Sequence, residues 1–237
     1  IQEAFQLIGE NMQQFVDSWK EATIEIADAR IEFSKFVQEG EDVARLVRDI
    51  TEMGEKYGFA VDQSLAAAAR MAQLSGIVGT GAMESATEVG IQFALIGGME
   101  TEQAMTRLIN LQQQTGFMYG EMTRETYLAL DAETQANVVR ENSIAILNQL
   151  NTVENRSAAT LSQITYVMNQ FASQADMAGD SIAEMAAMSA VLIEAGEEQG
   201  KAGRALKMVY ARLGADTNGA AQSLHAVGVA THDASGN

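Results

Sequence analysis

The sequence predicts an all-α fold in which a long N-terminal, coiled-coil-like helix precedes a compact bundle of short helices joined by Gly-rich turns. The 237 residues contain no proline, although an average usage of about 5% would give about a dozen. β-Sandwiches rarely lack proline, because their turns use it. Apolar residues recur at helical spacing along most of the chain, and glycines interrupt them. These observations favour an all-α fold over a β-sandwich.

The first segment, residues 1–57, predicts a self-associating helix. Its apolar residues form two rows with alternating steps of three and four, over roughly eight heptads, whereas three or four heptads already indicate a coiled coil. Charged and amide side chains fill the other faces. The residues predicted to form a seam between copies are Phe5, Ile8, Met12, Phe15, Trp19, Ile26, Phe33, Phe36, Val43, Val47 and Ile50.

The large aromatic residues of these rows would crowd a two-stranded seam, so three or more strands are expected. The predicted partner is therefore the chain itself, as a homotrimer or homohexamer. One alternative stays open, in which the segment is an amphipathic helix that packs on its own domain. Gly40 is the expected point of a break, and Glu41 and Asp42 suit the first turn of a new helix.

The second segment, residues 58–214, predicts a compact helical domain whose helices end at glycines. Gly97–Gly98 and Gly196 are the clearest stops, while Thr101 and Asp180 or Ser181 are expected N-caps. Residues 58–115 and 157–214 share an order of helices and turns, which indicates two related halves. Residues 215–237 are predicted to be a flexible tail or the start of a further segment.

The sequence offers no arrangement of catalytic, cofactor-binding or metal-binding residues, so the chain is not expected to be an enzyme. Cysteine is absent, and the only histidines are His225 and His232. The turn at 196–202 has too few residues between its glycines for a phosphate-binding loop, and Ala202 stands where a hydroxyl is needed. An inter-helix turn is the simpler interpretation.

The charge and the hydropathy pattern exclude two kinds of partner. A net charge of −17 argues against nucleic-acid binding, because a phosphate backbone attracts Lys and Arg. The longest uncharged runs, residues 71–83 and 89–99, are too short to span a bilayer. No membrane contact is expected from this segment.

The stretch from Ala187 to Gly214 carries a family resemblance. It reads as an apolar helix, a glycine-containing turn and a second helix, with a Gly-x-x-Ala-Gly-x-Ala-Leu-like pattern at Gly200, Ala202, Gly203, Ala205 and Leu206. The stretch resembles the signature region of phage tail tape measure proteins, and the resemblance covers roughly residues 50–215. It implies a docking-fold motif formed by Gly196, Gly200, Gly203, Arg204 and Leu206.

The resemblance implies a structural virion protein. It implies a place in the tail tube lumen or tail tip, control of tail length during assembly, and release ahead of the DNA at ejection. The implied partners are the tail tube and the tail-tip or baseplate hub proteins, after synthesis in the host cytoplasm, and the chain is expected to be part of a longer protein. The alternative is a cellular coiled-coil module, such as a secreted effector or toxin stalk. A stalked toxin should carry a long apolar hairpin, and the sequence shows none.

Overall fold

The computed structural model describes residues 24, 26–36, 42–75, 79–120, 122–213, 223 and 227–228, and these contain helices and turns but no strand. This confirms the all-α fold class. A helical segment over residues 26–33 comes first. The labelled elements that follow are α2 (Val43–Tyr57), α3 (Val61–Ser75), α4 (Thr80–Gly97), α5 (Thr101–Gln114), η1 (Phe117–Tyr119), α6 (Arg124–Leu128), α7 (Ala132–Glu154), α8 (Leu161–Met177), α9 (Ile182–Glu194) and α10 (Gln199–Leu213).

The N-terminal helix is not continuous over the described residues. The segment 26–33 ends in a turn, and α2 begins at Val43. The Asp42 side chain caps α2 by accepting a hydrogen bond from the Arg45 amide at 3.1 Å. A new helix therefore starts where the acidic pair after Gly40 predicted one. The first five residues of the predicted seam, Phe5 to Trp19, lie outside the described residues.

The later seam residues are used inside the chain itself. Phe33, Val47 and Ile50 are buried in a core that also holds residues of α3 and α4. Ile26, Phe36 and Val43 are partly buried against the same core. The predicted coiled coil is thus not confirmed, and the predicted boundary between residues 57 and 58 falls within this core. Apolar residues spaced by three and four positions form a stripe along one side of a helix. Such a stripe can pack against helices of the same chain as well as against another chain.

The buried side chains form two clusters that share three helices. The first core joins the segment 26–33, α2 and α3 to the N-terminal halves of α4 and α7. The second core joins α8, α9 and α10 to the C-terminal halves of the same two helices. α5 contributes Met105 and Ile109 to the first core, and Leu108 and Leu111 to the second. Since α4, α5 and α7 belong to both cores, they hold the two cores together.

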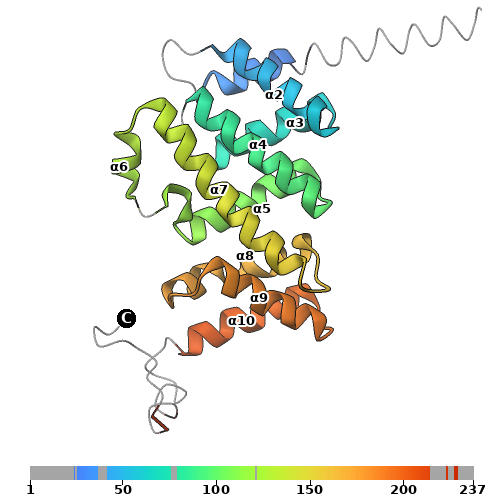
Figure 1. Cartoon of the computed structure of the whole chain (residues 1–237), viewed down its shortest axis with the longest axis vertical. Helices are drawn as coiled ribbons and strands as arrows, with labels where there is room; N and C mark the ends of the chain where they lie inside the picture. The colour runs from blue at the N-terminus through green and yellow to red at the C-terminus, as the bar shows by residue number, and fades with distance from the viewer. Residues whose placement is uncertain are drawn as a thin grey trace, which may run out of the picture.

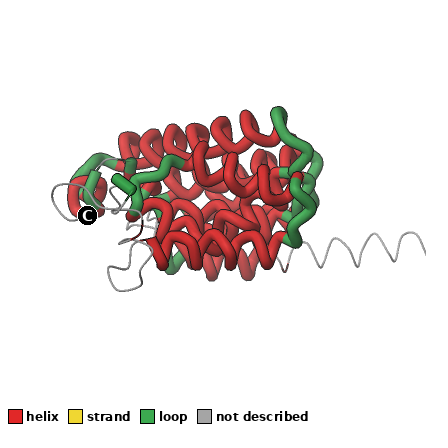
Figure 2. Tube along the Cα trace, turned by 90° about the horizontal axis from the view of Figure 1, so that it is seen from below, coloured by secondary structure: helices red, strands yellow, loops and turns green. Residues whose placement is uncertain are grey.

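The helices form a stack with α2 and α3 near one end and α10 at the other (Figure 1). The view from below shows the helices lying side by side, with many of the loops gathered at two edges (Figure 2). The stack therefore presents two end faces made of different helices.

Capping side chains and glycines explain where several helices begin and end. Thr160 and Ser181 each form a capping box with the side chain three residues later, which satisfies amides that the helix leaves free. Ser181 was among the predicted caps, and α4 ends at the predicted Gly97–Gly98 pair. Thr101 is not a cap, because α5 starts there and its buried hydroxyl donates to the Gln63 carbonyl at 3.0 Å.

The two halves of the chain share a packing pattern. The buried residues of α3 follow the same spacing as those of α8, and in each half the third helix packs back on the first. The matching buried residues are Ser64, Leu65, Ala67, Ala68, Met71 and Ala72 in α3, and Ile164, Thr165, Val167, Met168, Phe171 and Ala172 in α8. The predicted relation between residues 58–115 and 157–214 stays a prediction.

Replacing Tyr127 by phenylalanine is expected to keep or raise stability, by up to about 1 kcal/mol. Tyr127 is buried in the first core, and its hydroxyl has no hydrogen-bond partner among the described residues. Burial raises its pKa from 10.0 to about 12. The raised pKa means that the protonated hydroxyl favours the folded state. This contribution to stability is fully present below pH 10 and is lost as the pH rises through about 12. Urea unfolding at neutral and alkaline pH measures both effects; a destabilised variant at neutral pH would contradict the expectation.

Candidate functional site

The turn between α9 and α10 is set by a glycine. Gly196 has a φ of +86°, a left-handed conformation that side chains beyond hydrogen rarely adopt. The amides of Gly196 and Glu197 donate to the carbonyls of Ile193 and Leu192, at 3.0 and 3.1 Å. These bonds close the end of α9 and redirect the chain, so that α10 can pack against α8.

The start of α10 approaches α8 closely because its residues are small. A Cβ atom at Gly203 would lie 2.6–2.8 Å from the end of the Gln170 side chain, closer than atoms pack. Ala202 is buried one position earlier, and Leu206 is partly buried against the second core. Two residues of the predicted motif, Gly203 and Leu206, therefore lie on the packed side of α10, while the docking role of the motif stays a prediction.

An aromatic pair fixes the later turns of α10. The ring of Tyr210 stacks on Phe171 of α8, with centroids 5.8 Å apart and an interplanar angle of 9°. Its hydroxyl donates to the Asp180 carboxylate in the link between α8 and α9. Burial, followed by this hydrogen bond to Asp180, raises the pKa of Tyr210. The tyrosine thus joins α8, α10 and the link between α8 and α9, although no local sequence pattern marks it as a site residue.

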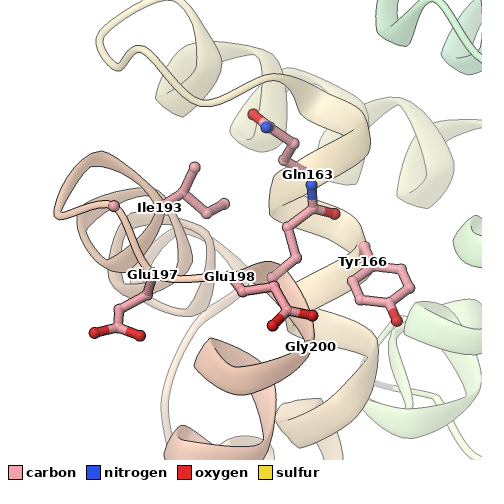
Figure 3. Close-up of a pocket in the computed structure, with 8 residues that line it drawn as sticks. Gln163, Tyr166, Ile193, Glu197, Glu198 and Gly200 are labelled. Carbon is pink, nitrogen blue, oxygen red and sulfur yellow. The ribbon is translucent and has the colours of Figure 1, made fainter.

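Beside the Gly196 turn lies an open hollow between α8, the end of α9 and the start of α10 (Figure 3). Its wall carries the carboxylates of Glu197 and Glu198, and Lys201 pairs with Glu198 at 3.5 Å. The two carboxylates make the hollow unsuitable for a phosphate. The described residues include no cluster of His, Cys, Asp and Glu that could hold a metal ion. The hollow is lined by Gln163, Tyr166, Ile193, Gly196, Glu197, Glu198, Gln199 and Gly200.

The predicted motif residues divide into two groups. Gly200 and Gly203 are buried, Leu206 is partly buried, and Gly196 forms the turn. Arg204 is exposed, and its guanidinium lies beside Gly200. The motif therefore contributes small residues to the packed side of α10 and a cation to its surface.

The contact between the two halves depends on residues that belong to no predicted motif. The Arg107 guanidinium of α5 donates to the Ser162 carbonyl and, at 2.9 Å, to its hydroxyl. It also lies over the Tyr166 ring, 5.6 Å from the centroid. Asn169 of α8 donates to the Arg107 carbonyl at 3.3 Å. These groups lie far apart in the sequence, so no local pattern could identify them.

The model of one protein family, described as phage-related minor tail protein, matches residues 48–237. The match includes most of the described helices and the whole Gly196 turn. The chain belongs to the phage-related minor tail protein family. No curated protein and no solved structure gave a match.

Membership of this family gives the chain a structural role in a phage tail and places it in the virion. The resemblance drawn from the Ala187–Gly214 stretch is thus confirmed at the level of a phage tail protein. Among the described residues, no helix combines the length and the apolar character needed to cross a membrane.

Replacing Gly203 by alanine is expected to stabilise the chain less than the same change at Gly200, because the gain in helix propensity, about 1 kcal/mol, is offset by the displacement of the Gln170 side chain between α8 and α10. Gly200→Ala is the matched control. It is buried on the same helix, but its added Cβ would meet its nearest neighbour, Arg204, at an ordinary 3.5 Å. Thermal unfolding of both variants tests the close approach, and equal effects would argue against it.

Proposed function

We propose that this chain is a segment of a phage tail tape measure protein. In this proposal it occupies the tail tube lumen, helps to set the length of the tail during assembly, and leaves ahead of the DNA at ejection. The observation that carries the proposal is the family match over residues 48–237, which includes the turn that resembles tape measure proteins. The all-helical stack and the excess of acidic residues also support it.

Within such a protein, the described helices act as a compact unit near one end of the tube. A ruler needs extended chain, and a helix supplies about 1.5 Å of length per residue. The stack from α2 to α10 is folded back on itself, so its role is anchorage and the length comes from other parts of the protein. The proposed contacts are with the tube and with the tail-tip or baseplate hub proteins.

The proposal includes self-association, as a trimer or a hexamer, without catalysis or a cofactor. Phe33, Val47 and Ile50 are buried within the chain, so the proposed contact between copies does not use them. The proposed contact between copies uses the predicted seam residues that lie outside the described ranges, Phe5, Ile8, Met12, Phe15 and Trp19.

Tail length is the test of this function. In the phage that encodes the chain, an in-frame duplication of a helical segment outside residues 24–213 should lengthen the tail by about 1.5 Å per added residue. A deletion of equal size should shorten it by the same amount. Electron micrographs of purified particles give the lengths. Tails of unchanged length that carry the altered protein would refute the ruler, while leaving the role in the tail intact.

A further inference from the structure

The contact between α5 and α8 holds two buried oxygen atoms that accept no hydrogen bond from a described residue. They are Oε1 of Gln114 and Oδ1 of Asn169. The nitrogens of the same two amides are paired, because Gln114 Nε2 donates to the main-chain carbonyl of Asn169 at 3.1 Å and Asn169 Nδ2 donates to the Arg107 carbonyl at 3.3 Å. Turning either amide over would set its oxygen against a carbonyl, so these bonds fix both oxygens as the unpaired atoms.

The two oxygens belong to one small region of the contact. Gln114 is the last residue of α5, and its side chain reaches the main chain of Asn169 in the middle of α8. The main-chain amides around Asn169 bond within α8, and two acceptors cannot bond each other. Native proteins pair the large majority of such atoms, since a buried oxygen without a donor destabilises the fold. A group that donates two hydrogens would satisfy both oxygens.

The surroundings favour water as that donor. A buried water needs a polar site with roughly two to four partners. The contact is polar at this edge, where the Arg107 guanidinium donates to the carbonyl and the hydroxyl of Ser162. The same guanidinium disfavours a metal cation, and the described residues include no cluster of acidic, His or Cys side chains that could bind one.

Tyr127 provides a contrast. Its hydroxyl is also buried without a partner among the described residues, but it lies in the first core, among apolar side chains. A single polar atom gives a water too few partners, which is why loss of this hydroxyl is expected to keep or raise stability. The presence of two acceptors in one contact distinguishes the region between α5 and α8.

We propose that a water molecule binds between α5 and α8, donating one hydrogen to Gln114 Oε1 and the other to Asn169 Oδ1. The bridge joins two side chains directly, whereas the hydrogen bond of Gln114 itself goes to the main chain of Asn169. A bridging water is nearly as favourable in enthalpy as a direct hydrogen bond. Since α5 and α8 belong to different halves of the chain, the water adds a contact between the halves. The water site is independent of the tape measure function.

A crystal structure of the chain, at a resolution that shows ordered water, tests the site directly. It should show a water within about 3.2 Å of both Gln114 Oε1 and Asn169 Oδ1. A water that contacts only one of the two oxygens, or the absence of an ordered water there, would overturn the bridge.

A double-mutant cycle tests the bridge in solution. The variants are Gln114→Met, Asn169→Leu and their combination, and urea unfolding gives the equilibrium constant of each. The hydrogen bond from Gln114 to the main chain of α8 survives Asn169→Leu, so it couples the two side chains only through the water. The combined change in the equilibrium constant should be about fivefold smaller than the product of the two single changes. A combined change equal to the product, or larger, would overturn the bridge, since two oxygens without a water repel each other.

The matched control combines Gln113→Met with Asn169→Leu. Gln113 carries the same amide one residue earlier on α5, but it donates to the Leu74 carbonyl of α3. This pair should show no coupling, and coupling as strong as that of Gln114 with Asn169 would also overturn the bridge. Circular dichroism checks that each variant folds, and the crystal structure of the original chain decides the question if one does not.

Discussion

Replacing Ile50 by alanine is expected to lower the free energy of unfolding by about 2–5 kcal/mol. Ile50 is buried in the first core, where α2 meets α3 and α4. The truncation removes apolar contacts and leaves a cavity that packed helices fill only in part. Because the contact lies within one chain, the loss should be independent of protein concentration. Urea unfolding at two protein concentrations at least tenfold apart measures the loss of stability and shows whether that loss depends on protein concentration.

The matched control is Ile31→Ala, the same truncation at a side chain that is 64% exposed on the preceding helical segment. It should change stability by no more than about 0.5 kcal/mol. A midpoint for Ile50→Ala that moved with concentration, relative to the original chain, would mean that α2 is buried between chains. The account of the first core would then be wrong.

Replacing Phe171 by alanine is expected to cost about 3–5 kcal/mol. Phe171 is buried at the centre of the second core, and its ring carries the stacked ring of Tyr210. The variant would lose its own packing and also loosen the contact that holds α10 against α8. Hydrogen exchange should therefore increase most in α10, and thermal unfolding should show a lower midpoint.

Tyr166→Ala provides the comparison on the same helix. Tyr166 is also aromatic, but it is 44% exposed and contacts Arg107 through its ring face. Its loss should cost about 1 kcal/mol or less. If both truncations had equal effects, the stack of Phe171 and Tyr210 would not be the element that secures α10.

The sequence was sufficient to predict the all-α class and many helix ends, because these depend on local chemistry. Glycine in the left-handed conformation ends α9 at Gly196, and a hydroxyl followed by a carboxylate three residues later starts α9 at Ser181. Both signals are contained within a few residues.

The partners of each face could not be predicted in the same way. The spacing of Phe33, Val47 and Ile50 shows which side of a helix is apolar, but not which chain covers it. The stack of Phe171 on Tyr210 joins residues far apart in the sequence, as does the bond from Arg107 to Ser162. Such pairs have no local signal, because they form only when distant helices pack.

The position of the chain inside the tail can be measured directly with a cysteine variant. The chain contains no cysteine, and Met177 at the end of α8 is 82% exposed, so Met177→Cys supplies one accessible thiol without disturbing a core. A maleimide attached to a dextran too large for the tube lumen should label the isolated chain and the chain released at ejection, but not the chain in intact virions. The original phage controls for thiols elsewhere in the particle. Labelling of intact virions at the rate of the isolated chain would contradict a place in the lumen.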